Sequence, residues 1–483
     1  MEQLIGRERE ISELTRCYAS QRSEFVILYG RRRIGKTFLV SQTFHDRFTF
    51  YFTGSHKSSK SRQLELFAKA LRKYASLRYL PAIDSWYHAF DALEEMLEAM
   101  PVTERKVLFF DELPWIDTYN SEFVAALEDF WNTWAAQRDD IFLIACGSAT
   151  SWMVDNLIEN QGGLHNRITS RIYLRPFTLN ECEQYLRQHN CQWDRYSIVQ
   201  CYMYLGGVPY YWSLLDFSRD LPTNIDRLFF NTHAKLEGEF NELFNVLFRD
   251  AEKYVAIVQL LANHRDGLTR AELASKLTNG GTLTKRLENL QRCDFIIGYT
   301  PLGNKKKGSI YRLTDFYTLF YFKFIAATRL RDSSYWMLKM ATPEVKAWQG
   351  LTFELICIMH NSQIIQRLGI SGVLTETYTW RSKATDGHSG TQIDLVIERA
   401  DRYIYLCEMK FAEESFVITK DLADRLRQRM ATFREDTKTR KTLLTTLVTT
   451  YGVKPNMHSG IVQREVLMDD LFAPLGPGAG LQG

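Results

Sequence analysis

The chain has 483 residues, of which 45% are hydrophobic and 24% charged, the balance of an ordinary soluble globular protein. This composition excludes a disordered, collagen-like or disulfide-dense chain, and about 100–200 residues per domain predicts roughly three folded units. The formal net charge of +3 is nearly neutral, so any nucleic-acid contact must come from a local basic patch. No apolar run approaches the ~20 residues that cross a bilayer, and the first residues lack the pattern of a signal peptide. Because none of the eight cysteines forms a C-x-x-C pair, we expect a reduced, cytoplasmic environment.

Residues 1–175 alternate short apolar runs with helical patterns. The candidate strands are 25–29, 48–52, 107–110 and 141–146, and the candidate helices include 61–74 and 122–136. Strands that are apolar on both faces and separated by helices predict an α/β fold with a parallel sheet covered by helices. The next segment, 176–250, is predicted to be wholly helical and to open at Pro176.

Residues 251–313 have a different pattern, typical of a winged helix-turn-helix. Three helices are closed by a hairpin whose tip carries Lys305, Lys306 and Lys307; the helices are 253–261, 271–277 and 283–292, and the strands are 295–300 and 309–313. The three lysines could contact DNA phosphates or simply keep a turn soluble. Residues 314–345 are predicted to be an aromatic helical connector.

The last unit, 346–472, is predicted to be a second α/β domain, and the Gly- and Pro-rich segment 473–483 to be a flexible tail. A helix is expected over 346–359, strands over 377–381, 392–398 and 403–410, a basic helix over 421–433 and a final strand over 442–449.

The segment after the first strand matches G-x-x-x-x-G-K-T and predicts a P-loop; it runs Gly30, Arg31, Arg32, Arg33, Ile34, Gly35, Lys36, Thr37. Its glycines let backbone N–H groups surround a phosphate at a helix N-terminus. We expect Lys36 to contact the β- and γ-phosphates of ATP and the Thr37 hydroxyl to bind Mg²⁺. The three arginines occupy open positions of the pattern and are either phosphate contacts or ordinary exposed charge.

A strand that ends in Asp111-Glu112 supplies the expected partner of the P-loop. Asp111 is predicted to lie near Mg²⁺, and Glu112 to polarise the attacking water. Because one candidate strand intervenes between the two motifs, we expect their strands to neighbour each other in the sheet without being consecutive in the chain.

Together with the opening Ile5-Gly6-Arg7-Glu8 and the run 144–148, these motifs resemble the AAA+/STAND-like prokaryotic ATPases called archaeal-type ATPases, over about residues 1–215. The resemblance implies that Gly6 and Arg7 lie beside the adenine and that Ser148 is a sensor residue at the γ-phosphate. It also implies a helical lid with Pro209 near the base. Either Arg167 or Arg171 could act as an arginine finger in a neighbouring subunit of a homo-oligomer, although a surface salt bridge is the alternative for each.

A second group of polar residues lies near the other end of the chain. Asp394 belongs to one candidate strand, and Glu408 and Lys410 point to one face of the next. Two carboxylates and a lysine at adjacent strand ends can bind a divalent cation and orient water at a phosphodiester. A surface salt bridge is the other interpretation, although unpaired charges on a buried sheet would be costly.

This D…E-x-K arrangement resembles the PD-(D/E)xK nuclease-like domain that follows the winged helix in many archaeal-type ATPases. The resemblance covers roughly residues 346–450 and implies that Glu354 is a further acidic residue of a second Mg²⁺ or Mn²⁺ site. Ile393, where the family pattern has proline, departs from it. Arg425, Arg427 and Arg429 on the basic helix either follow a nucleic-acid backbone or solvate a face.

Two functions remain open from the sequence. The first is an Mg²⁺-dependent ATPase coupled to DNA binding and metal-dependent DNA cleavage. The alternative is an ATP-gated regulatory or assembly protein whose nuclease-like domain is non-catalytic.

Overall fold

The computed structural model describes residues 4–75, 82–101, 104–159, 162–164, 166–277, 282–299, 309–328, 334–382 and 390–475. The chain forms two compact units, one of residues 1–176 with 247–249 and one of residues 177–246 with 250–483. None of the helices in the described ranges has the length and apolarity needed to span a membrane. All eight cysteines lie in these ranges, are buried and form no disulfide.

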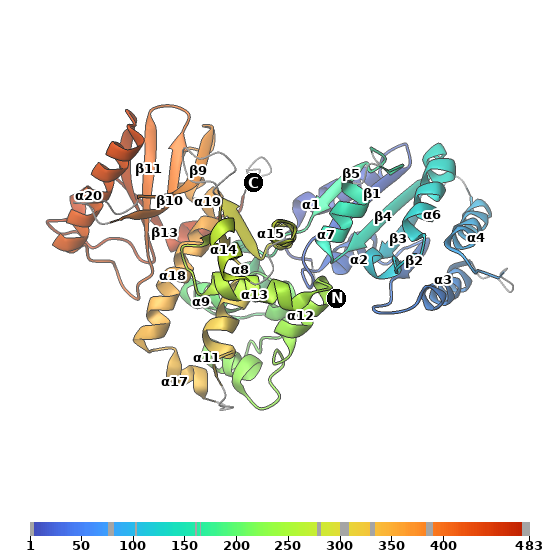
Figure 1. Ribbon diagram of the computed structural model, residues 1–483, viewed down its shortest axis with the longest axis horizontal. Helices are drawn as coiled ribbons and strands as arrows, with labels where there is room; N and C mark the ends of the chain where they lie inside the picture. The colour runs from blue at the N-terminus through green and yellow to red at the C-terminus, as the bar shows by residue number, and fades with distance from the viewer. Residues whose placement is uncertain are drawn as a thin grey trace. The chain divides into compact units, whose positions relative to one another are not determined.

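The first unit is a parallel five-stranded sheet with helices on both faces (Figure 1). The strands β1, β3 and β4 are buried along nearly their whole length, which explains their continuous apolar sequences. Helices α1 and α2 pack on one face, and α3, α4 and α6 pack on the other. The elements are α1 (Glu8–Tyr18), β1 (Glu24–Tyr29), α2 (Lys36–Phe44), β2 (Phe50–Thr53), α3 (Lys60–Ala75), α4 (Trp86–Glu98), β3 (Lys106–Asp111), α5 (Leu113–Ile116), α6 (Phe123–Asp129), β4 (Ile141–Gly147), α7 (Thr150–Met153) and β5 (Ser170–Tyr173).

The strand order, β2-β3-β4-β1-β5, corrects one expectation. The strands that lead to the P-loop and to the acidic pair are β1 and β3, and they are not neighbours, because β4 pairs with both. Parallel strands nevertheless end at the same edge of the sheet, so the residues that follow β1, β3 and β4 converge there. The helix expected over 122–136 is also shorter, since its α-helical part, α6, continues as a π-helical turn over Phe130–Trp134.

The second unit begins with a helical segment, as expected, although its first helix starts at Leu179 rather than at Pro176. Thr178 and Glu181 form a capping box there, and this fixes the start of the helix. The helices are α8 (Leu179–Gln188), α9 (Arg195–Leu205), α10 (Pro209–Ser213), α11 (Leu221–Ile225) and α12 (Glu239–Leu247).

Residues 251–313 contain the three expected helices and the two hairpin strands. A short additional strand pairs with the hairpin and gives the order β6-β8-β7. The elements are α13 (Ala251–Ala262), β6 (Leu268–Thr269), α14 (Arg270–Lys276), α15 (Leu283–Arg292), β7 (Ile296–Tyr299) and β8 (Ile310–Leu313). Lys305, Lys306 and Lys307 lie outside the described residues. We call residues 251–313 the helix-hairpin module.

The remaining residues form a connector and a second five-stranded sheet, of order β13-β12-β11-β10-β9. Helix α20 packs against one face of the sheet, and α18 packs against β11, where the Phe353 and Phe411 rings lie 5.2 Å apart. Helix α19 and strand β13 were not anticipated, and positions 476–483 of the expected tail lie outside the described residues. The elements are α16 (Phe316–Phe320), α17 (Tyr335–Lys339), α18 (Pro343–Met359), α19 (Asn361–Arg367), β9 (Thr375–Arg381), β10 (Gln392–Arg399), β11 (Tyr403–Lys410), α20 (Lys420–Thr437), β12 (Thr442–Thr449) and β13 (Arg464–Leu467). We call residues 346–472 the C-terminal module.

Candidate functional site

The loop between β1 and α2 has the backbone conformation that its two glycines allow. Gly30 has a φ of 142°, and a Cβ atom there would lie 2.4 Å from the Leu174 carbonyl oxygen. Gly35 has a φ of 86° and immediately precedes α2. Side chains at these positions would be strained or would clash, and the helix N-terminus that follows is suited to bind an anion.

Lys36 and Thr37, the first residues of α2, connect this loop to the acidic pair. The Lys36 ammonium is buried and donates to the carbonyl oxygens of Gly30, at 3.1 Å, and Arg31, at 2.9 Å. The Thr37 hydroxyl donates to Oδ2 of Asp111 at 2.8 Å. A hydroxyl and a carboxylate in contact at the end of β3 are hard oxygen ligands, the set that Mg²⁺ prefers. These residues therefore fit the ion that accompanies a nucleotide.

Glu112 follows Asp111 and is held by Ser148, which follows β4. Its Oε2 atom accepts hydrogen bonds from the Ser148 hydroxyl, at 2.8 Å, and from the Ser148 backbone N–H, at 3.1 Å. Burial raises the pKa of Glu112, Lys36 and the Ser148 bonds act to lower it, and Asp111 adds to the rise. The Glu112 backbone has a φ of 51°, a left-handed conformation that is costly for a non-glycine residue and is often found at functional sites.

The other residues predicted for this site have varied environments. The backbone of Gly6 and Arg7 is left-handed where α1 begins. Arg31 and Ile34 are buried, whereas Arg32 and Arg33 are partly exposed.

The two candidate finger arginines, Arg167 and Arg171, are exposed in this chain, and Arg171 lies on β5. Pro209 belongs to the second unit, where it is the first residue of α10. The exposure of Arg167 and Arg171 and the position of Pro209 do not test the roles predicted for these residues.

One residue that sequence analysis missed is Gln63 on α3. Its side chain is fully buried, and its amide donates to the carbonyl oxygens of Ser55, at 2.7 Å, and Trp115, at 2.6 Å. Gln63 therefore ties the loop after β2 to α5, the helix that follows the acidic pair. Nothing in the sequence around a glutamine within a helix indicates that its side chain joins two loops in this way.

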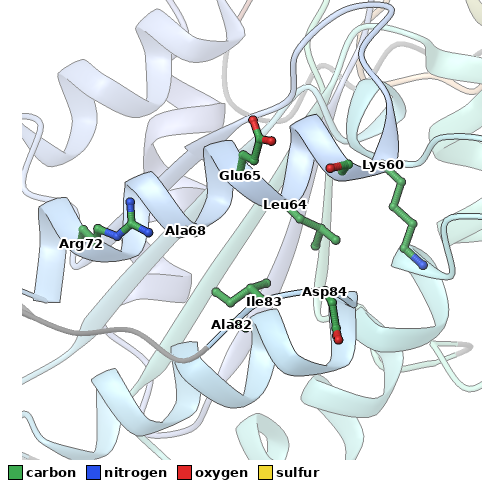
Figure 2. A pocket seen from close by; sticks show the side chains of 9 residues that line it. Lys60, Leu64, Glu65, Ala68, Arg72, Ala82, Ile83 and Asp84 are labelled. Carbon is green, nitrogen blue, oxygen red and sulfur yellow. The ribbon is translucent and has the colours of Figure 1, made fainter.

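A pocket of about 630 Å³ opens between α3 and the start of α4. Figure 2 shows Leu64 and Ile83 between the charged side chains of Lys60, Glu65 and Arg72. None of its lining residues belongs to the P-loop or to the acidic pair. The pocket is therefore separate from the phosphate site.

In the C-terminal module, the expected metal ligands fall into two groups. Glu354 on α18 and Asp394 on β10 form the first group, and Arg265 from the helix-hairpin module forms ion pairs with both carboxylates. Glu408 on β11 forms the second group, with Lys410 at 2.6 Å and Arg429 at 2.5 Å. Within the described ranges, no three His, Cys, Asp or Glu side chains are grouped so that they could hold a metal ion.

The surroundings of the two groups shift the pKa values of their glutamates in opposite directions. Burial, reinforced by Asp394, raises the pKa of Glu354 to about 7 even though Arg265 opposes the rise. Burial would also raise the pKa of Glu408, but Lys410 and Arg429 lower it overall. The residues as arranged hold cationic side chains, so they do not fit a metal ion in this conformation.

The three arginines predicted on the basic helix α20 have different surroundings. Arg429 is engaged by Glu408, Arg427 pairs with Asp424 at 2.6 Å, and Arg425 is exposed. Arg425 and Arg427 are both exposed, as a backbone contact requires, whereas Arg429 is partly buried.

Residues 4–215 match the family described as an ATPase domain predominantly from Archaea. An uncharacterized protein of Methanocaldococcus jannaschii is 25% identical over 331 residues, which cover 66% of this chain and 68% of that protein. A Walker-type ATPase of Pyrococcus abyssi is similar at 17% identity with a TM-score of 0.47, covering 66% of this chain and 96% of that one. The ORC2 protein of Aeropyrum pernix is similar at 14% identity with a TM-score of 0.43, covering 70% and 96%. The match over residues 4–215 is to an ATPase domain, and the chain is an ATP-hydrolysing enzyme.

Proposed function

We propose that this protein is an Mg²⁺-dependent ATPase that couples nucleotide hydrolysis to DNA binding, and that its C-terminal module is a metal-dependent nuclease. The observation that carries the ATPase part is the convergence of Thr37, Asp111, Glu112 and Ser148 at one sheet edge, with hydrogen bonds of 2.8 Å across three different segments.

Each residue of the ATP site has a distinct task in this proposal. Lys36 turns its ammonium from the loop carbonyls to the phosphates, and the P-loop N–H groups surround them. Thr37 and Asp111 hold Mg²⁺, which neutralises charge on the phosphates when it is bound. Glu112 accepts a proton from, or orients, the attacking water, and Ser148 fixes the carboxylate in position.

Support for DNA binding comes from the helix-hairpin module. Three helices followed by a hairpin are the elements of a winged helix, in which one helix enters a groove of the duplex. The proposal keeps Lys305, Lys306 and Lys307 as the wing, Arg167 or Arg171 as a finger between subunits of a homo-oligomer, and Asp394, Glu408 and Lys410 as the cleavage site.

A second candidate function is an ATP-gated regulatory or assembly protein with a non-catalytic C-terminal module. The specific observation in its favour is that Glu354, Asp394 and Glu408 are all engaged by arginine or lysine. Carboxylates paired in this way are structural ion pairs and need no metal.

The two functions are separated by parallel assays on the full chain. In the ATPase assay, Lys36→Ala should lower nucleotide affinity, whereas Glu112→Gln should retain binding and lose turnover by about 10²-fold or more. In the DNA assays with Mg²⁺ or Mn²⁺, the wild type should bind and cut at least one DNA form, and Asp394→Ala should bind without cutting. Unchanged hydrolysis by Glu112→Gln would refute the ATPase assignment of that residue, and binding without cleavage by the wild type would favour the regulator.

A further inference from the structure

We propose that two arginines of the helix-hairpin module, Arg265 and Arg312, form a latch that occupies the carboxylate site of the C-terminal module in place of a divalent cation. This inference rests on the proposed metal site, because it names the regulation of that site. We call these two residues the arginine latch.

The latch arginines reach the carboxylates from a different module. Arg265 lies in the turn after α13, and its Nη2 atom contacts Oε2 of Glu354 and lies 3.9 Å from Oδ2 of Asp394. Arg312, on β8, places Nη1 3.7 Å from Oδ1 of Asp394. One guanidinium nitrogen thus lies between two carboxylates, which is the position that a bridging cation would take.

The side chains in these contacts are largely buried, so the contacts differ from ion pairs on the exposed surface. The side chains of Glu354, Asp394 and Arg312 are 12%, 18% and 8% exposed, respectively. Carboxylates this far from solvent need a cationic partner or a proton, because an unpaired buried charge is strongly destabilising. Without the latch a divalent metal ion is one such partner, since it supplies more charge in a smaller volume.

Further contacts fix the two modules in this arrangement. A second ion pair joins the modules with the charges exchanged. Arg381 of β9, in the C-terminal module, lies 3.6 Å from Asp266 of the helix-hairpin module. The Tyr299 hydroxyl of β7 donates to the Asp266 carbonyl oxygen at 3.0 Å. The turn that carries Arg265 is therefore held by a contact within its own module and by one from the C-terminal module.

The strand register explains why release of the latch would complete the site. Leu395 lies opposite Cys407, and Asp394 and Glu408 are the residues that adjoin this pair on the two strands. Glu408 is held by Lys410 and Arg429. In the latched state the two carboxylates have different cationic partners, so neither contributes to a shared ion.

The latch predicts how metal binding changes when it is removed. The full chain without nucleotide is titrated with Mn²⁺, and bound ion is measured by electron paramagnetic resonance together with the thermal unfolding temperature. The double variant Arg265→Ala/Arg312→Ala should bind one additional Mn²⁺ at least tenfold more tightly than the wild type. It should also unfold at a lower temperature without metal and regain stability with it, since the ion replaces the lost cations.

Three further variants control this experiment. Arg427→Ala removes an arginine of α20 that pairs with Asp424 and is not part of the latch, and it should behave as the wild type does toward Mn²⁺. Adding Asp394→Asn to the double variant should abolish the additional ion. Arg265→Gln keeps a hydrogen-bond donor at a half-exposed position, so it tests the latch if the double variant does not fold.

The outcomes separate the latch from the proposed metal site. Equal, Asp394-dependent Mn²⁺ binding by the wild type and the latch variants would overturn the latch and leave the metal site standing. Absence of an Asp394-dependent ion in every variant would overturn both.

Discussion

Removal of the Ser148 hydroxyl tests whether this residue acts on Glu112 or on the nucleotide. In the structure, Ser148 donates two hydrogen bonds to one carboxylate oxygen of Glu112, at 2.8 and 3.1 Å. Ser148→Ala deletes the shorter bond and keeps the backbone one. The remaining contact should hold Glu112 in place, so the main effect should be on its ionisation.

The size and sign of that effect can be worked out. A hydrogen bond to a charged group contributes about 1.5 kcal/mol, and one pKa unit corresponds to about 1.4 kcal/mol. The Ser148 bonds lower the pKa of Glu112 against the rise caused by burial. Loss of the hydroxyl should therefore raise that pKa further. Because Glu112 acts in its ionised form, the acid limb of the pH–rate profile should move to higher pH, and kcat below the wild-type limb should fall roughly tenfold.

The assay is steady-state ATP hydrolysis at saturating ATP and Mg²⁺ between about pH 5 and pH 9, where kcat reports the groups of the enzyme–substrate complex. Ser148→Thr retains a hydroxyl and should keep the wild-type limb. Circular dichroism at each pH verifies that the protein is folded. If kcat falls in Ser148→Ala while its acid limb stays at the wild-type pH, Ser148 acts on the phosphate, and the argument from Glu112 is wrong.

Two other predictions concern the stability of the second unit. Burial lowers the pKa of His360 from 6.5 to about 4, so the unfolded chain binds a proton in this range that the folded chain does not. Between pH 7 and pH 5, urea titrations should show the wild type losing about 2 kcal/mol more stability than His360→Gln; equal losses would contradict the assignment. At Gly207, an added Cβ would lie 2.0 Å from the Phe177 carbonyl oxygen, whereas Gly238 has open space. Gly207→Ala should thus cost more than about 2 kcal/mol and Gly238→Ala far less, as thermal unfolding can verify; similar losses would show that the backbone relaxes.

Local patterns were sufficient to predict the P-loop and the acidic pair. Gly30 and Gly35 require φ values that glycine adopts readily, and Asp111 ends a strand that is buried throughout. Both signals lie within a few residues of the chemistry that they support. The strand order could not be found in this way, because placing β4 between β1 and β3 depends on packing across the whole sheet.

Local sequence patterns do not show which side chains contact the predicted site residues. Ser148 is 36 residues from Glu112 in the chain, and Arg265 is 89 residues from Glu354. Nothing near Arg265 or Arg312 marks either residue as a partner of a carboxylate, since arginine on a turn or a short strand is ordinary surface chemistry. The sequence thus singles out the acidic residues of the candidate sites, whereas the fold determines which cationic side chains they meet.

Helix α18 links the carboxylate site to helices α8 and α9, which lie within the residues that match the ATPase family. It carries Glu354, which the arginine latch holds. At its C-terminal end, His360 accepts a hydrogen bond at Nε2 from the Leu179 N–H of α8, at 3.2 Å. Nearer its start, the Gln349 amide donates to the Tyr204 hydroxyl of α9 at 2.9 Å. A displacement of α8 and α9 must therefore carry α18 with it or break these buried bonds, and in the first case the displacement acts directly on the carboxylate that the latch holds.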